Sequence, residues 1–179
     1  MLTLILGGAR SGKSRLAQRL AIEAGRVIYV ATAQAAGDHE MLARIAHHRD
    51  SRPSEWKTIE EPFALGRAVE RAASDADAIL VDCLTIWLSN LFWEYRDEAP
   101  GRAEEVWRSN LEQISSASHG PHIILVSNEL GSGTVPEVTL TRAFRDAQGL
   151  LNQHAAELAN QVILTVAGLP LYLKKSYSQ

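Results

Sequence analysis

Short apolar runs recur along the chain, and longer amphipathic stretches separate them. An apolar run of about four to eight residues, bounded by polar or turn residues, is typical of a buried strand. Two weaker candidates are Trp56–Glu60 and the short run Leu171–Leu173. The strong runs are Leu2–Leu6, Arg26–Thr32, Ala78–Asp82, His122–Ser127 and Gln161–Ala167.

Between these runs, apolar residues recur every three or four positions, which predicts helices with one buried face. Gly66 is expected to weaken one of them, and Gly149 to interrupt the last. Residues Gly168–Pro170 are expected to form a turn. The predicted helices are Lys13–Ala24, 38–48, Leu65–Ala72, Leu84–Trp93, Arg102–His119 and Pro136–Leu158.

The alternation of strands and helices predicts an α/β fold with a mainly parallel sheet. Crossovers between parallel strands are right-handed, and helices are expected to cover both faces of the sheet. No internal repeat, linker or low-complexity segment divides the chain. We therefore expect residues 1–179 to form a single domain, a length that can bury a sizeable core.

Composition narrows the class of protein further. The chain carries a net charge of −3 and has no basic block, which argues against a nucleic-acid partner. No stretch approaches about 18 uninterrupted apolar residues, and the first residues lack a basic leader, so we expect neither a membrane span nor export. Cys83 is the only cysteine, which favours the reducing cytoplasm. Because it follows an apolar run, Cys83 is expected to be a buried structural thiol.

A glycine-rich segment joins the first predicted strand to the first predicted helix, and it has the pattern G-x-x-x-x-G-K-S of a phosphate-binding loop. Glycines let backbone N–H groups converge on a phosphate, and the helix N-terminus adds the positive end of its dipole. Lys13 would reach the β- and γ-phosphates, and Ser14 would hold Mg²⁺. The sequence therefore predicts a nucleotide-binding loop made of Gly7, Gly8, Ala9, Arg10, Ser11, Gly12, Lys13 and Ser14.

A carboxylate ends the apolar run at Asp82, which resembles a Walker B element. Taken alone, such a run is more often only a strand end. Mg²⁺ that bridges nucleotide phosphates takes one or two carboxylates plus waters. Beside a phosphate loop, we therefore interpret Asp82 as a metal-supporting residue.

Polar residues follow two of the predicted strands. In open parallel sheets, loops at the carboxyl ends of the strands line the ligand crevice. Thr32, Ala33 and Gln34 lie where one strand is expected to end, although the residues alone favour a plain polar turn. The segment Asn128–Gly133 follows another, and an ordinary glycine turn is an even alternative.

Adjacent histidines lie on the predicted helix 38–48, where Met41, Leu42 and Ile45 form the apolar stripe. At about 100° per residue, His48 falls near the edge of that stripe and His47 points away from it. Periodicity alone thus favours a solvated surface role for His47. A zinc pair is disfavoured because adjacent residues do not face each other on a helix.

The stretch Leu84–Trp93 is unusually apolar, with Trp87, Leu88, Leu91, Phe92 and Trp93. Core packing is the default interpretation of aromatic residues at helical spacing. So much apolar surface on one short helix also indicates a subunit interface.

Taken together, these motifs resemble the bifunctional adenosylcobinamide kinase/adenosylcobinamide-phosphate guanylyltransferase family of cobalamin biosynthesis. The resemblance covers nearly the full length. The phosphate loop is generic to NTPases, whereas the double-histidine and Asn-Glu-Leu-Gly segments are more specific. The matching segments are 7–14, Tyr29–Gln34, Glu40–Pro53, Asp82–Thr85, Ser127–Pro136, Gly149–Gln153 and Gly168–Pro170.

The resemblance implies a RecA-like P-loop NTPase fold and two reactions. The enzyme would phosphorylate the hydroxyl of the aminopropanol arm of adenosylcobinamide with ATP or GTP. It would then transfer GMP from GTP to that phosphate, which yields adenosylcobinamide-GDP and pyrophosphate. Members are typically homotrimers, which suits the apolar helix Leu84–Trp93.

For the guanylyl transfer, the resemblance implies that His47 becomes guanylylated, which reverses the interpretation from periodicity. It also implies that His48, Arg49, Asp50, Ser51 and Glu61 join the nucleotide site. Two other functions remain open on the residues alone. One is a small-molecule kinase without guanylyl transfer, and the other is a non-enzymatic nucleotide switch.

Overall fold

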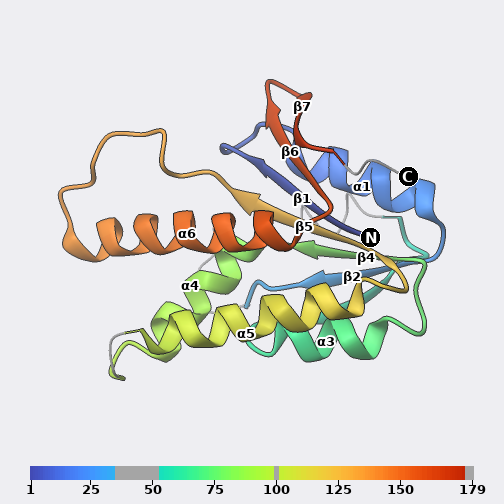
Figure 1. Ribbon diagram of the computed structural model, residues 1–179, viewed down its shortest axis with the longest axis horizontal. Helices are drawn as coiled ribbons and strands as arrows, with labels where there is room; N and C mark the ends of the chain where they lie inside the picture. The colour runs from blue at the N-terminus through green and yellow to red at the C-terminus, as the bar shows by residue number, and fades with distance from the viewer. Residues whose placement is uncertain (35–52, 99–100, 176–179) are drawn as a thin grey trace.

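The computed structural model of the chain describes residues 1–34, 53–98 and 101–175 (Figure 1). Its strands form one seven-stranded sheet in the order β3-β2-β4-β5-β1-β6-β7. Strand β5 therefore separates β1, which leads into the glycine-rich loop, from β4, which ends in Asp82. The strands are β1 (Leu2–Gly7), β2 (Val27–Ala31), β3 (Lys57–Glu60), β4 (Ala78–Asp82), β5 (His122–Asn128), β6 (Gln161–Val166) and β7 (Leu169–Lys174).

Strands β1 to β6 are parallel, as the sequence predicts, and β7 is antiparallel to β6. The predicted turn at Gly168–Pro170 is right for Gly168 and wrong for Leu169 and Pro170, which already pair with Val166 and Thr165. The turn consists of Ala167 and Gly168, both with positive φ. Proline is tolerated here because β7 is the last strand of the sheet and one of its edges has no partner strand.

Helices cover both faces of this sheet, as predicted, but unequally within the described residues (Figure 1). One face packs against α1 (Lys13–Ala24), while four helices pack against the other. Successive strand residues point to opposite faces, so Ile5 joins the α1 side and Leu4 joins the other. The four helices are α3 (Leu65–Ala72), α4 (Leu84–Glu94), α5 (Arg102–Ala117) and α6 (Thr139–Leu158).

The two helical glycines lie in different surroundings, and only Gly149 departs from expectation. Helix α6 begins at Thr139 rather than Pro136 and runs through Gly149 without interruption. One glycine costs a helix only about 1 kcal/mol, and burial of Leu151 and Ala155 on the same helix offsets it. Gly66 packs closely against α5, because a Cβ there would lie 3.0 Å from Gln113 Cβ and 3.1 Å from the Asn110 carbonyl oxygen.

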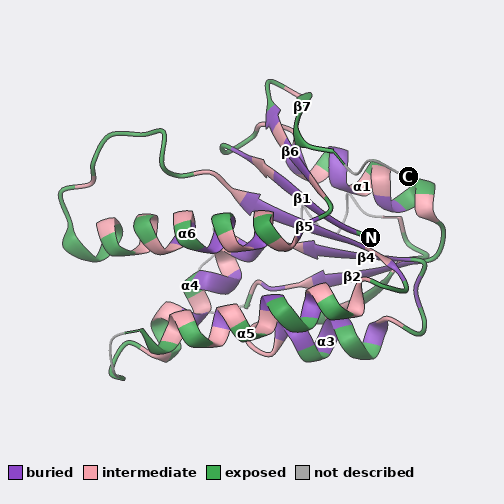
Figure 2. Ribbon diagram, viewed as in Figure 1, coloured by how far each residue is buried: buried purple, intermediate pink, exposed green. Residues whose placement is uncertain are grey.

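Most of the apolar surface of α4 lies in the core of this chain. Leu84, Trp87, Leu88 and Leu91 are fully buried, and the Trp87 indole donates a 2.9 Å hydrogen bond to the carbonyl of Phe63. Trp93 is the exception, with 70% of its surface exposed. Core packing, the default interpretation from the sequence, is therefore confirmed for most of α4 (Figure 2).

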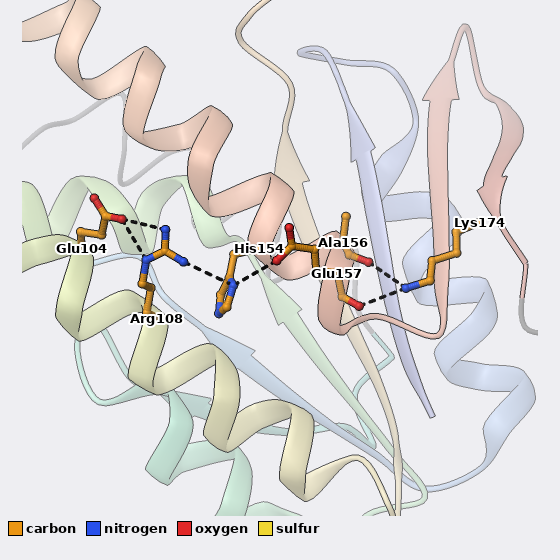
Figure 3. A network of polar contacts seen from close by, with 6 residues as sticks. All are labelled: Glu104, Arg108, His154, Ala156, Glu157 and Lys174. Atoms are coloured by element: carbon orange, nitrogen blue, oxygen red, sulfur yellow. Dashed lines mark hydrogen bonds and ion pairs between the residues drawn. The ribbon is translucent and has the colours of Figure 1, made fainter.

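Polar contacts join α5, α6 and β7 along one side of the molecule (Figure 3). Arg108 on α5 pairs with Glu104 at 2.8 Å and approaches His154 Nδ1 on α6 at 3.5 Å. Lys174 on β7 donates to the carbonyl oxygens of Ala156 and Glu157 at 3.1 and 3.0 Å. Since carbonyls in the last turn of a helix lack helical partners, this lysine caps α6 and fastens the end of β7 to it. None of the helices in the described ranges is long and apolar enough to cross a membrane.

Candidate nucleotide-binding site

The glycine-rich loop connects the end of β1 to the first turn of α1, as the sequence predicts. Gly12 has φ +98° and precedes the helix directly, a backbone conformation that glycine adopts without side-chain strain. Gly8, Ala9 and Arg10 are exposed, whereas Lys13 is buried. The Lys13 ammonium donates a 2.7 Å hydrogen bond to the Gly8 carbonyl, so the loop folds over the lysine at a helix N-terminus.

Asp82 supplies the negative charge that acts on Lys13. Burial lowers the pKa of Lys13, while Cys83 and Asp82 act in the opposite direction. Burial, and then the Asp82 charge, raise the pKa of the Cys83 thiol to about 12. Because that thiol is uncharged near pH 7, Asp82 is the one of these two groups whose charge favours the protonated lysine there. The structure therefore brings a buried cation and a carboxylate together at the ends of β1 and β4.

The chemistry of the donor set at this edge fits Mg²⁺. Asp82 ends β4 half-buried, and Ser14 lies half-buried in the first turn of α1. Mg²⁺ keeps several waters and binds through one or two protein groups plus substrate phosphates, so it needs no dedicated protein cage. Within the described ranges no three His, Cys, Asp or Glu side chains gather as a metal cluster.

Thr32 joins the end of β2 to the end of β4. Its hydroxyl donates to the Cys83 carbonyl at 2.8 Å and accepts from the Cys83 N–H at 3.0 Å. The Thr32 carbonyl accepts a 2.8 Å hydrogen bond from the Asn90 amide. The Thr32 side chain is fully buried, so it holds Asp82 and Cys83 in place instead of lining an open crevice. Cys83 is also buried, which confirms the expected structural thiol.

The segment after β5 lies beside the glycine-rich loop. Asn128 is in register with Gly7, and the Glu129 N–H donates a 3.0 Å hydrogen bond to the Gly7 carbonyl. The Asn128 N–H donates to Thr85 Oγ1 at 2.9 Å, which links this segment to the start of α4. Glu129 accepts hydrogen bonds from the N–H groups of Gly131 and Ser132, so its carboxylate shapes its own turn.

A buried polar cluster behind Asn128 was missed by the sequence analysis. Ser127 donates to Asn152 Oδ1 at 2.6 Å, and the Gln148 amide reaches both of these side chains at 3.0 Å. Asn152 in turn donates to the Asn128 carbonyl at 3.0 Å. The available signal was the pair of amides at i, i+4 on the face of α6 that also carries Leu151. These contacts fix the end of β5 against α6.

The remaining candidates fall into separate groups. Ala33 and Gln34 come after Thr32 beyond the end of β2, and they are half-buried and exposed respectively. Glu61 lies after β3, and its Oε1 accepts from the N–H groups of Phe63 and Ala64 at 2.9 and 2.8 Å, which supports the start of α3. The candidates His47, His48, Arg49, Asp50 and Ser51 lie outside the described residues.

A cavity of about 370 Å³ between α3 and α5 is a poor nucleotide site. Its lining includes Glu70 and Glu112 and contains no cationic side chain. Phosphates carry negative charge, so electrostatics favours the loop that contains Lys13 over this cavity.

Comparison with known proteins identifies the family. The family model described as cobinamide kinase / cobinamide phosphate guanyltransferase matches residues 3–173. The chain is 50% identical to the bifunctional adenosylcobalamin biosynthesis protein CobP of Pseudomonas aeruginosa, over 97% of this chain and 98% of that protein. It is 37% identical to the bifunctional adenosylcobalamin biosynthesis protein CobU of Escherichia coli, over 97% of this chain and all of that protein. The CobU protein of Salmonella typhimurium is 38% identical over the same shares. With a family model that matches nearly its whole length, the chain belongs to the cobinamide kinase / cobinamide phosphate guanyltransferase family.

Proposed function

We propose that this chain catalyses both reactions of its family in cobalamin biosynthesis, with residues 7–14 as the site of phosphoryl transfer. The substrates would be adenosylcobinamide and ATP or GTP. The observation that carries this proposal is the loop itself, in which the buried Lys13 ammonium bonds the Gly8 carbonyl beside the charge of Asp82. Phosphoryl transfer depends on positioning and charge neutralisation, and this arrangement provides both.

In the kinase step, the loop N–H groups and Lys13 would hold the β- and γ-phosphates while the substrate hydroxyl attacks the γ-phosphorus. Ser14 and Asp82 would hold Mg²⁺, Asp82 directly or through water. When bound, the ion neutralises charge that develops on the phosphate oxygens. The Asp82 charge also favours the protonated form of Lys13, and Thr32 holds the Cys83 backbone next to Asp82 at the end of β4.

For the second step, we propose His47 as the nucleophile, supported by family membership and by its place in the sequence. A neutral imidazole nitrogen would attack the α-phosphorus of GTP, which forms an N–P bond and expels pyrophosphate. The phosphate of the substrate would then attack the same phosphorus, which breaks the N–P bond and releases adenosylcobinamide-GDP. Covalent catalysis splits one transfer into two easier ones. We assign Ala33, Gln34, His48, Arg49, Asp50, Ser51 and Glu61 to the nucleotide site on the same grounds.

Labelled GTP tests this proposal directly. GTP labelled at the α-phosphate should leave acid-labile label on the protein, and GTP labelled at the γ-phosphate should leave none by this route. His47→Ala should abolish the adduct, and His48→Ala, the matched neighbour, should reduce it less. A small-molecule kinase without guanylyl transfer would phosphorylate adenosylcobinamide and form no adduct, and a nucleotide switch would do neither. A His47→Ala protein that still forms the adduct would refute the assignment.

We also propose that the chain works as a homotrimer in a reducing cytoplasm. Support for an assembly comes from large apolar side chains left exposed on α4, on α6 and on the connection before α6. Sedimentation equilibrium should give three times the 19.6 kDa chain mass, and a monomer at working concentration would refute the assembly. These side chains are Trp93, Val135, Val138 and Leu140, with exposed fractions of 62 to 70%.

A further inference from the structure

The β6–β7 turn lies directly against the glycine-rich loop. The Gly168 N–H donates a 2.8 Å hydrogen bond to the Ser11 carbonyl. A Cβ built on Gly12 would lie 3.1 Å from the Gly168 Cα, so the two glycines are in close contact. A Cβ on Gly7 would lie 2.5 Å from the Thr165 carbonyl oxygen. Both glycines of the loop pattern therefore face the same hairpin, which a side chain on Gly7 would overlap and a side chain on Gly12 would crowd.

This hairpin is held at several points. Strand β6 pairs with β1 over Thr3–Leu6, so its end is fixed relative to the start of the loop. The two-residue turn of Ala167 and Gly168 has φ values of +51° and +81°, the backbone that favours a tight hairpin. At its other end, Lys174 caps the last carbonyls of α6 (Figure 3). The short turn and these contacts hold the hairpin in a fixed position beside the glycine-rich loop.

The hydrogen bond from Gly168 has a consequence for the loop. The peptide unit between Ser11 and Gly12 is planar and trans, so its carbonyl and its N–H point in opposite directions. Because the Ser11 carbonyl points at the hairpin, the Gly12 N–H points away from it. An N–H oriented in this way is available to a phosphate bound at the start of α1.

We propose that the β6–β7 turn is a positioning element of the phosphate loop, with Gly168 and Thr165 as its positioning residues. This rests on the nucleotide-binding role proposed above for residues 7–14. The turn fixes the Ser11–Gly12 peptide before any ligand arrives, so binding does not have to order it. Neither residue needs to touch the nucleotide for this effect.

The test compares two glycines that share a left-handed backbone. Gly168→Ala introduces strain at φ +81° in the turn, while Gly101→Ala introduces the same kind of strain at φ +94° before α5, where a Cβ meets nothing within 4 Å. We expect Gly168→Ala to weaken binding of GTP and of pyrophosphate by about tenfold in calorimetry, the effect of one misplaced hydrogen-bond donor. Gly101→Ala should bind both as the wild type does, at a similar loss of melting temperature.

Equal affinities of the two glycine variants would overturn the inference while leaving the nucleotide site intact. Lys13→Ala tests the nucleotide-binding role of residues 7–14 separately from the positioning role of the β6–β7 turn. This variant should lose pyrophosphate binding while the hairpin stays unchanged. If Lys13→Ala bound pyrophosphate like the wild type, the loop assignment itself would fail, and the inference with it.

Thr165 provides a second test that does not depend on backbone strain. Its side chain is buried, its hydroxyl has no hydrogen-bond partner among the described residues, and its Cγ2 methyl lies 3.7 Å from a Cβ built on Gly12. Thr165→Val keeps a methyl group beside the loop and should retain pyrophosphate affinity. Thr165→Ser removes that methyl and should weaken it several-fold. If Thr165→Ser bound pyrophosphate more tightly than Thr165→Val, the proposed packing role of the Thr165 methyl group would be overturned.

Discussion

Asp82 combines several physical roles in one side chain. It ends a buried strand, it opposes the effect of burial on Lys13, and it raises the pKa of its neighbour Cys83. The isosteric change Asp82→Asn removes the charge and keeps the shape. Burial would then lower the pKa of Lys13 without opposition from a carboxylate.

We expect Asp82→Asn to reduce kinase activity at least about tenfold, with the alkaline limb of the pH–rate profile moved to lower pH. Asp77→Asn is the matched control, since Asp77 immediately precedes the same strand at its opposite end and its 3.9 Å pair with Arg26 is exposed. The measurement is the initial rate of substrate phosphorylation from pH 6 to about pH 10. An unshifted profile with full activity would leave Asp82 as a structural strand end.

His122, the first residue of β5, makes the stability of the fold depend on pH because its side chain is partly buried. Burial, and then the charge of the Met1 amino group, lower the pKa of His122 to about 4. The unfolded chain binds the proton near pH 6.5 and the folded chain does not, so stability is full above pH 6.5 and falls as the pH drops toward 4. His122→Gln should flatten this part of the dependence. Urea unfolding at several pH values measures it, and parallel curves for the two proteins would contradict the argument.

Some properties of single residues could be predicted from the sequence, and others could not. The burial of Cys83 follows from the apolar run before it. The hydroxyl of Thr32 bonds the Cys83 backbone 51 residues away, and no local pattern carries that information. The histidines were predicted from resemblance, against the periodicity of the segment, and they lie outside the described residues.

At the scale of elements, alanine substitutions at two helix glycines, Gly66 and Gly149, should change the free energy of unfolding in opposite directions. Gly66→Ala on α3 places a Cβ 3.0 Å from Gln113 Cβ and 3.1 Å from the Asn110 carbonyl oxygen, so α5 would have to shift by a few tenths of an ångström. We expect a loss of about 1–3 kcal/mol in the free energy of unfolding. Gly149→Ala on α6 meets nothing within 4 Å and should gain about 0.5–1 kcal/mol. Urea titration measures both, and the same sign for both would contradict the packing argument.

Local patterns predicted the parallel strands and most helices, because burial imposes its period directly on the sequence. These patterns failed where a residue type is common in two different structural settings. Gly168 and Pro170 are typical of a turn, yet Pro170 lies in β7, where an edge strand tolerates a missing N–H. Gly66 weakens an isolated helix, but here it allows α3 and α5 to approach.

At the scale of the whole molecule, the sequence predicted that loops at the carboxyl ends of parallel strands would meet, and Lys13 and Asp82 do. The strand order was not predictable. Placing β5 between β1 and β4 depends on pairings such as Leu4 with Leu125, which are distant in sequence. Only such long-range packing decides which strands become neighbours.

Cys83 offers a reporter of opening of the whole molecule, because it is the only cysteine and is buried. Its pKa of about 12 in the fold, against 9.0 for a free thiol, leaves little thiolate near pH 8. Because the unfolded thiol releases its proton above about pH 9 and the folded one does not, the Cys83 contribution to stability is lost as the pH rises above about 9. A thiol reagent should therefore label the native protein slowly, and urea should accelerate the reaction.

Bound nucleotide should slow this labelling further. A ligand that binds only the folded chain reduces the open population by the factor 1 + [L]/Kd, which is about 100-fold at a ligand concentration of 100 Kd. GTP with Mg²⁺ should therefore protect Cys83 in the wild type, and Lys13→Ala should lose that protection while its rate without nucleotide stays close to the wild type. Labelling at the rate of a free thiol in native buffer would contradict the buried position of Cys83. Equal protection of both proteins by GTP would show that Lys13 contributes nothing to nucleotide binding.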